Sequence, residues 1–225
     1  TFLTGIITKV TYPLLSKIRE DKKRVSNIYK QILQFTFFCS APLFIFAAAL
    51  AEPLFLLILG EEWNMAAKIF QIFCFAFMFY PVQAFNINAL MVYGRSDLFL
   101  RLEIIKKIFI TLAIIVGFQF GIYGLVWATV ASSLFALFVN THYSGKLIGY
   151  DKYSQFKDLS VFLIISLFSA GVFYTLSNYL TFNSLILQII FSGFVGVILD
   201  TVINIVFKTN PIKFIQGLIK ERRLS

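Results

Sequence analysis

Residues 35–59 read FTFFCSAPLFIFAAALAEPLFLLIL, and Glu52 is the only charged residue among them. A helix of this length is roughly 37 Å long at 1.5 Å per residue, while the hydrocarbon core of a bilayer is about 30 Å thick. The stretch therefore predicts a membrane-spanning helix with some tilt. Basic residues precede it, and acidic residues with a tryptophan follow it at residues 60–63 (GEEW). This asymmetry indicates an orientation as well as a span.

The composition of the whole chain is that of a membrane protein. Hydrophobic residues make up 59% of the 225 residues and charged residues only 14%, whereas a soluble globular chain carries about 25% charged residues. Apolar stretches near the length of a span also occur at residues 66–93, 98–118, 122–143, 159–180 and 185–207. Together with residues 31–59, they predict an all-α, polytopic transmembrane helical bundle with six complete spans.

The chain opens on Thr1, and residues 1–7 (TFLTGII) read as the end of an apolar segment. We therefore expect the chain to be the C-terminal part of a longer protein, beginning with the tail of a seventh span. The predicted parts are a truncated span with a basic cytoplasmic segment (1–30), four spans that form the core of a lobe (31–143), a cytoplasmic loop (144–158), two further spans (159–207) and a basic cytoplasmic tail (208–225).

The segments that connect these predicted spans alternate between the two sides of the membrane, and the basic residues concentrate on one side. All 20 Lys and Arg residues except Lys68 fall in segments on one side of the membrane, and the positive-inside rule makes that side cytoplasmic. Both ends of the chain are then cytoplasmic. The net charge of +9 follows from this topology and from attraction to anionic lipids, so we do not expect nucleic-acid binding.

The sequence contains no catalytic constellation, no metal-ligand spacing and no cofactor motif. We therefore expect a protein that is not an enzyme and that holds neither a metal nor a cofactor. Ionisable residues within predicted spans are the candidate functional residues instead.

Four of these residues lie in the first half of the span predicted at residues 98–118: Arg101, Glu103, Lys106 and Lys107. In one interpretation the basic side chains snorkel to the interface, while Glu103 pairs with Lys106 or Lys107 at helical spacing. In the other they line a cavity that receives an anionic, lipid-linked ligand, because lysine ammonium groups attract a diphosphate. Both interpretations stay open at this point.

Two further acids lie within spans. Glu52 precedes Pro53 near the external end of residues 31–59, and it is either an interfacial carboxylate, a cap on a kinked turn, or a functional acid. Asp200 lies two turns before Lys208. It either pairs with a cytoplasmic lysine, hydrogen-bonds Asn204, or acts as a functional intramembrane acid.

Three prolines interrupt predicted spans, Pro42, Pro53 and Pro81. Membrane helices tolerate proline where neighbouring groups bond to the freed carbonyls, and kinks are the expected consequence. The same residues are candidate hinges for alternating access, and the sequence does not separate a hinge from a tolerated kink.

Three stretches together resemble a known family. They are residues 10–18 (VTYPLLSKI), residues 51–63 with AEP at their start and LGEEW at their end, and residues 94–106 (GRSDLFLRLEIIK). In this order and spacing they resemble the bacterial polysaccharide exporter family, the Wzx-like flippases of the multidrug/oligosaccharidyl-lipid/polysaccharide exporter superfamily. The resemblance covers roughly residues 9–150.

The resemblance implies a fold and a function. Members of that family have twelve or fourteen helices in two lobes around a central cavity, and this chain corresponds to most of the C-terminal lobe. They move a polyprenyl-diphosphate-linked oligosaccharide from the cytoplasmic to the outer leaflet of the bacterial inner membrane, for O-antigen, capsule or exopolysaccharide synthesis. The implied partners are the lipid bilayer, the lipid-linked oligosaccharide, the N-terminal lobe of the same chain and polysaccharide-assembly proteins.

Two alternatives to this function stay open. One is another carrier of the same superfamily, either a flippase for the peptidoglycan precursor or a drug/cation antiporter; acids deep in the spans would favour an antiporter, and only Asp200 is a candidate. The other is a membrane-embedded glycosyltransferase or polymerase. Such an enzyme would carry acids or histidines on a sizeable polar loop, and the longest polar connection, at residues 144–158, has no such cluster.

Overall fold

The computed structural model describes residues 20–179, 185–207 and 209–212, and every regular element in these ranges is helical. This confirms the predicted all-α fold. The described elements are, in chain order, α2 (Lys22–Leu59), the 3-10 turn η1 (Glu61–Trp63), α3 (Asn64–Phe77), α4 (Tyr80–Val92), α5 (Ser96–Phe118), α6 (Gly121–Ile148), α7 (Lys152–Tyr179) and α8 (Leu185–Val206).

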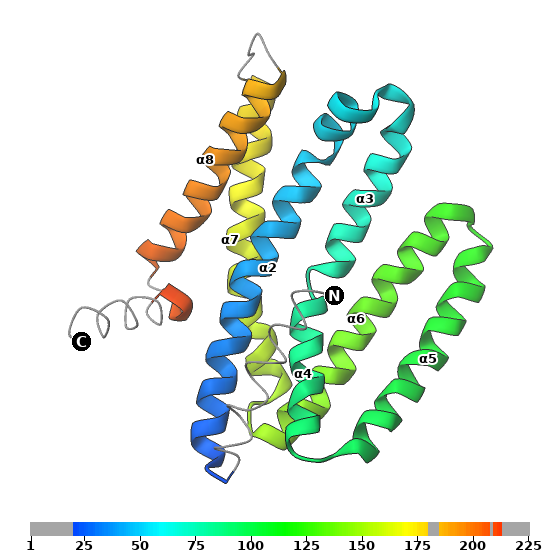
Figure 1. Cartoon of the computed structure of the whole chain (residues 1–225), viewed down its shortest axis with the longest axis vertical. Coiled ribbons are helices and arrows are strands. Elements are labelled where there is room, and N and C mark those ends of the chain that lie inside the picture. The colour runs from blue at the N-terminus through cyan, green and yellow to red at the C-terminus, as the bar shows by residue number, and fades with distance from the viewer. Residues whose placement is uncertain (1–19, 180–184, 208, 213–225) are drawn as a thin grey trace.

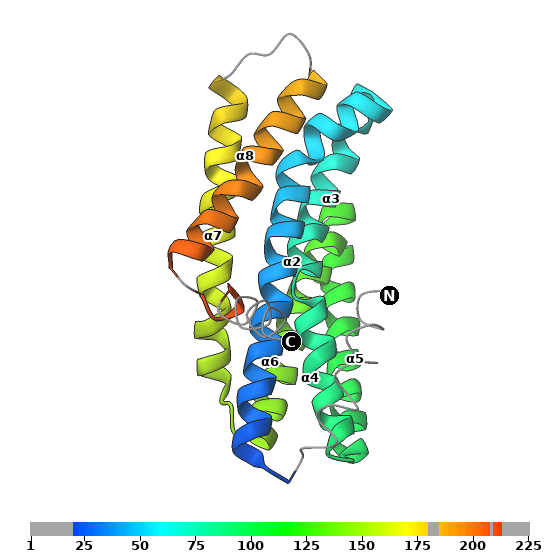
Figure 2. The ribbon, with the colours of Figure 1, turned by 60° about the vertical axis from the view of Figure 1, so that its left-hand side comes forward.

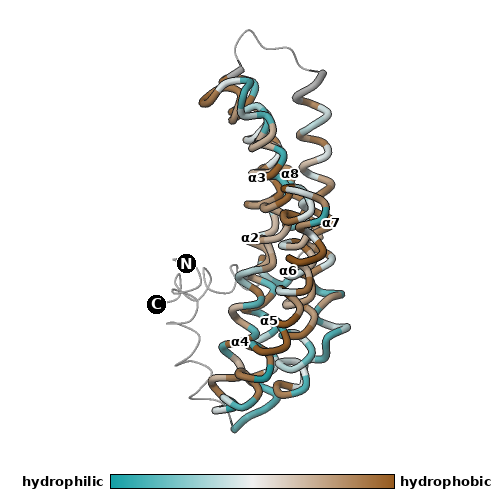
Figure 3. The backbone as a smooth tube through the Cα atoms, turned by 90° about the vertical axis from the view of Figure 1, so that its right-hand side faces the viewer, coloured by the Kyte–Doolittle hydropathy of each residue, from teal (hydrophilic) through white to brown (hydrophobic). Residues whose placement is uncertain are grey.

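Helix α2 lies at the centre of the bundle (Figure 1). Helices α7 and α8 pack on one side of it, while α3 and α4 pack on the other and are themselves covered by α6. Helix α5 forms a hairpin with α6 at the edge of the molecule, and the turned view separates α7 and α8 from α3, α4 and α5 (Figure 2). Seen from the side, hydrophilic residues gather mainly toward the lower end of the bundle (Figure 3).

Five helical segments in the described part of the chain are long and apolar enough to cross a membrane, by length and composition. They are Lys22–Leu59, Glu61–Val92, Gly121–Ile148, Lys152–Leu176 and Ile186–Val206. The sixth predicted span corresponds to α5, which does not meet this criterion because its first half carries five charged residues, Asp97, Arg101, Glu103, Lys106 and Lys107. The chain is therefore a polytopic helical membrane protein, and a crossing by α5 remains a prediction.

Helix α2 is longer than the predicted span at residues 31–59. It begins at Lys22, because the Asp21 side chain caps it by accepting a hydrogen bond from the backbone N–H of Arg24 at 3.0 Å. A carboxylate at this position stabilises the first turn through the unpaired N–H groups there. The helix then continues through Pro42 and Pro53 without a break.

The span at residues 66–93 is interrupted near Pro81, as the predicted kink requires. Helix α3 ends at Phe77 and α4 begins at Tyr80, with Pro81 in its first turn, where the missing N–H is tolerated. Side chains from other helices bond to carbonyls at the interruption. The Ser40 hydroxyl donates to the carbonyl of Met78 at 3.1 Å, and the Ser133 hydroxyl donates to the carbonyl of Ala76. Because these bonds satisfy carbonyl groups at the interruption, a broken helix is tolerated inside an apolar bundle.

The connection between α6 and α7 is shorter than the loop predicted at residues 144–158. Helix α6 continues to Ile148, where Gly149 takes a left-handed conformation with φ 78°. Helix α7 starts at Lys152, and the Asp151 side chain accepts hydrogen bonds from the N–H groups that follow it. The polar residues of this region therefore extend two helices rather than form a loop. The predicted turn at residues 181–184 and most of the predicted tail lie outside the described residues.

Aromatic stacking and a buried polar network hold α2, α4 and α6 together. Tyr29 stacks on Phe85 with ring centroids 4.6 Å apart, and both side chains are fully buried. The Tyr29 hydroxyl donates to the Asn86 side chain, which in turn donates to Thr141 at 3.0 Å. Because each buried polar group here finds a partner, the network fixes the relative positions of three helices.

We expect Gly60→Ala to destabilise the full-length protein by roughly 1–3 kcal/mol, because Gly60 has φ 92° and ψ 175°, a conformation essentially confined to glycine. The residue ends α2 and turns the chain into η1. Thermal unfolding of the purified protein measures the effect. Gly193→Ala is the matched control, since Gly193 lies within α8 and an added Cβ would meet only Leu50 at 3.9 Å. Equal stability of the two variants would contradict the prediction.

Candidate functional site

The turn between α4 and α5 sets the position of the charged group on α5. Gly94 takes a left-handed conformation with φ 66°. The Arg95 guanidinium then donates to both carboxylate oxygens of Asp97, at 2.9 and 2.8 Å. These bonds hold the pKa of Asp97 at about 2, so the pair stays ionised at neutral pH. The stretch at residues 94–106, noted in the sequence, therefore begins with a tight turn and an ion pair at the start of α5.

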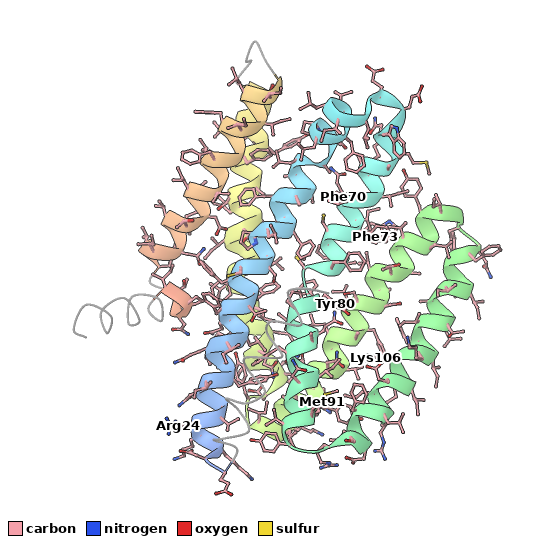
Figure 4. The ribbon with its side chains drawn as sticks, in the orientation of Figure 1. Arg24, Phe70, Phe73, Tyr80, Met91 and Lys106 are labelled. Atoms are coloured by element: carbon pink, nitrogen blue, oxygen red, sulfur yellow. The ribbon has the colours of Figure 1, made fainter. Side chains whose placement is uncertain are left out.

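A pocket of about 460 Å³ lies between α4, α5 and α6. Three of the four predicted charges on α5 line it, Glu103, Lys106 and Lys107. Arg101 is exposed and is not among the lining residues. The remaining lining residues are Tyr80, Gln83, Ala84, Ile87, Asn88, Ile110 and Ala136. Lys106 projects from α5 toward the neighbouring helices (Figure 4).

Lys106 is the buried member of the charged group. Its side chain is 10% exposed, and its ammonium group pairs with the Glu103 carboxylate one turn earlier. Lys107, by contrast, is exposed. The local pairing predicted for Glu103 is therefore present, and the lysines also line a pocket, so features of both interpretations occur together. With two lysines and one glutamate, the pocket wall carries net positive charge.

Helix α4 supplies the uncharged polar groups of the pocket. Gln83 is buried, and its amide nitrogen donates to the backbone carbonyl and the hydroxyl of Ser133 on α6, at 3.0 and 3.1 Å. Tyr80 and Asn88 line the same pocket, at one turn before and just over one turn after Gln83. Such groups can hydrogen-bond sugar hydroxyls, while lysine ammonium groups can bind phosphate oxygens.

Tyr80, Gln83 and Asn88 were not predicted as site residues from the sequence. The signal that could have identified them is their polarity within the otherwise apolar residues 66–93. The break at Pro81 is also relevant, because it starts α4 as a separate helix whose polar face turns toward α5 and α6.

The structure places Glu52 away from the charged group on α5. Glu52 is exposed and lines a second pocket of about 560 Å³ with Glu61 and Asn64, where α2 passes into η1 and α3. Within the described part of the chain, no group of three or more His, Cys, Asp or Glu side chains is arranged to hold a metal ion. Pro53 lines the same pocket.

Asp200 is separate from both pockets and is only 4% exposed. Its carboxylate accepts hydrogen bonds from Ser166 on α7 at 2.9 Å and from the Asn204 amide at 3.2 Å. The predicted hydrogen bond to Asn204 is thus present. The alternative, pairing with Lys208, concerns a residue outside the described ones.

One protein family and two known proteins are similar to parts of this chain. A family described as "Polysaccharide biosynthesis protein" matches residues 1–68. An uncharacterized membrane protein in the cps region of Klebsiella pneumoniae is 27% identical over 106 residues, which cover 47% of this chain and 22% of that protein. The lipopolysaccharide biosynthesis protein WzxC of Escherichia coli K12 is 24% identical over 117 residues, covering 52% of this chain and 24% of WzxC.

These matches support a Wzx-like polysaccharide exporter family. They confirm the family resemblance seen in the sequence. The matched segments span about a quarter of the length of the curated relatives. No solved structure gives a significant match to the chain.

Proposed function

We propose that this chain is part of a transporter that moves a polyprenyl-diphosphate-linked oligosaccharide from the inner to the outer leaflet of a bacterial inner membrane. The product would feed O-antigen, capsule or exopolysaccharide synthesis. The observation that carries the proposal is the cationic, polar pocket between α4, α5 and α6 in a predominantly apolar membrane bundle. The similarity to polysaccharide and lipopolysaccharide biosynthesis proteins supports the same process.

The chemistry of the pocket suits the headgroup of such a lipid. Lys106 and Lys107 would contact the negatively charged diphosphate, and Glu103 would hold the Lys106 ammonium group in place. Gln83 and Asn88 would hydrogen-bond sugar hydroxyls. The polyprenyl tail would stay in the bilayer beside the apolar helix faces. A polar headgroup needs this kind of shelter, because crossing the hydrocarbon region without partners is costly.

One observation favours a second candidate function. Asp200 is an acid buried among α7 and α8, and buried intramembrane acids are typical of ion-coupled carriers. A drug/cation antiporter of the same superfamily therefore stays the alternative. Transport rather than glycosyl transfer is proposed in both cases.

Deletion of the full-length gene in its host separates the two candidates. The proposal expects loss of surface polysaccharide, accumulation of the lipid-linked oligosaccharide on the cytoplasmic leaflet, and recovery when the gene is supplied again. Normal surface polysaccharide combined with increased drug sensitivity would contradict the proposal and favour the antiporter.

A further inference from the structure

Asp200 lies deep within the apolar part of the bundle. Its partner Ser166 is about 10 Å along α7 from Leu159, where the apolar part of that helix begins, at 1.5 Å per residue. One turn before Asp200, Gly196 packs against the ring of Phe46 on α2. Helix α8 ends well above the lower ends of α2 and α7 (Figures 1 and 2). The acid is therefore remote from the predicted cytoplasmic ends of its neighbours.

The groups around Asp200 in the described part of the chain are neutral. Besides Ser166, the Asn204 side chain donates both to the Asp200 carboxylate and to its backbone carbonyl. Residues 31–51 of α2 and 159–179 of α7 contain no charged residue, and neither does α8 apart from Asp200. The titratable side chains in these stretches are Cys39, Tyr174 and Tyr179; Cys39 and Tyr174 are exposed.

A carboxylate buried among neutral groups is costly unless a cation joins it. The described surroundings of Asp200 supply hydroxyl and amide groups instead of a second charge. Uptake of a proton removes the charge without requiring further ligands. A metal ion, by contrast, needs several oxygen ligands, and the Asn204 amide presents its nitrogen rather than its oxygen to the carboxylate.

Further polar groups lie beside Asp200 on one side, at the end of α8. Thr209 is buried, and its hydroxyl donates to the side-chain oxygen of Asn204 at 3.3 Å. The next residue, Asn210, is exposed and donates to Gln34 of α2 at 3.0 Å. Hydrogen bonds therefore link the carboxylate to Asn204 and Thr209, and the next residue along the chain carries an exposed amide.

The opposite side of Asp200 is mainly apolar, apart from the buried Ser169 hydroxyl. Phe46 and Phe173 meet edge to face with ring centroids 6.3 Å apart, and Ala170 is buried in the same cluster. Gly196 touches the Phe46 ring and places α8 directly against this cluster. Because the aromatic rings offer no hydrogen-bond partners in the direction of the external end, we expect proton access from the side of Thr209 in this conformation.

We propose that Asp200, Ser166 and Asn204 form a buried proton-binding site that exchanges its proton with water from the side of Thr209. The side reached in this way is the one predicted to be cytoplasmic. A proton from water adds to a carboxylate oxygen and converts the anion to the neutral acid. Ser166 suits both states, because a hydroxyl donates to the carboxylate and accepts from the acid. Ser169, one turn further along α7, is a fully buried hydroxyl with no partner among the described residues.

Protonation would change the contact between α7 and α8. The Ser166 hydroxyl bonds across these two helices, so reversal of its hydrogen bond alters how they pack. This consequence rests on the proposed transport function: proton release toward one side would accompany a change in the conformation of the lobe. Proton binding itself can be measured without any substrate.

Infrared difference spectroscopy of the full-length protein in lipid nanodiscs tests the site. Spectra recorded over roughly pH 5 to 9 should contain the carbonyl band of a protonated carboxylic acid that disappears as the pH rises. Asp200→Asn should remove this band while the protein stays folded, since the amide replaces the carboxyl at nearly the same size. Ser166→Ala keeps the acid and should shift both the band and the pH at which it appears.

Asp97→Asn is the matched control, because Asp97 is exposed and its pKa of about 2 keeps it ionised throughout this range. The band should be unchanged in that variant. A spectrum without any band that depends on Asp200 would overturn the proposal. So would a band that appears only in Lys208→Gln, because Asp200 would then be a permanently ion-paired acid. Stabilisation by sodium that Asp200→Asn abolishes would assign the site to sodium instead of a proton.

Discussion

Lys106→Gln is expected to lower polysaccharide export by roughly tenfold or more in cells that carry the full-length protein. The side chain is 10% exposed and lines the pocket between α4, α5 and α6. Its replacement removes a cation that would bind the diphosphate, and a hydrogen bond to a charged group is worth about 1.5–3 kcal/mol. The rate at which lipid-linked oligosaccharide reaches the outer leaflet measures the effect, with the protein level in the membrane determined in parallel.

Two variants separate ligand binding from local ion pairing. Arg101→Gln removes one positive charge from the same helix, but Arg101 is exposed and does not line the pocket, so export should stay close to normal. In the double variant Glu103→Gln/Lys106→Gln, no carboxylate is left without its partner. If the double variant restores export, Lys106 serves only to neutralise Glu103, and the proposed role in binding is wrong.

The helical bundle could be predicted from the sequence because apolar length is a direct signal of a membrane span. Residues 35–59 predicted the central helix, and the structure places α2 there. The start of α2 was less predictable. The polar residues from Lys22 onward belong to the same helix, because a capped helix continues beyond the membrane wherever polar side chains can reach water. Polarity therefore marks the end of a span and not the end of a helix.

The charged residues of α5 could be identified from the sequence, but their separate environments could not. Glu103 and Lys106 are one turn apart, and their pairing follows from helical spacing. Only tertiary packing shows that Lys106 is buried while Arg101 is exposed. The polar groups that face them come from α4, and helical periodicity within one segment carries no information about that contact.

The depth of Asp200 within the bundle could not be predicted from the sequence either. Its spacing from Lys208 suggests a carboxylate near the cytoplasmic end of a span. In the structure α8 ends high on the bundle, and the turn at Asn210 contacts Gln34 on α2. The level at which a helix ends relative to its neighbours depends on inter-helix contacts. Asp200, which the sequence suggests is near the interface, therefore lies deeply buried in the structure.

Gly117 and Gly124 allow the backbones of α5 and α6 to approach closely at the turn of their hairpin. A Cβ added to Gly124 would lie 2.1 Å from the carbonyl oxygen of Gly117 and 2.6 Å from the Cβ of Phe120. The nearest obstacle is backbone, which cannot rotate away as a flexible side chain can. The close approach of these residues sets the distance between α5 and α6, and thereby the position of Lys106 relative to Ala136 on α6.

Gly124→Ala should therefore destabilise the full-length protein by roughly 1–3 kcal/mol or more, in the range of overpacked interiors, and should also impair export because α5 is displaced from α6. Thermal unfolding in detergent measures the stability. Gly171→Ala is the matched control: Gly171 lies within α7 with open space around it, and alanine is favoured over glycine in a helix by roughly 0.5–1 kcal/mol. The control should be neutral or slightly stabilising. If both variants unfold at the same temperature, α5 and α6 do not make this close contact in the membrane.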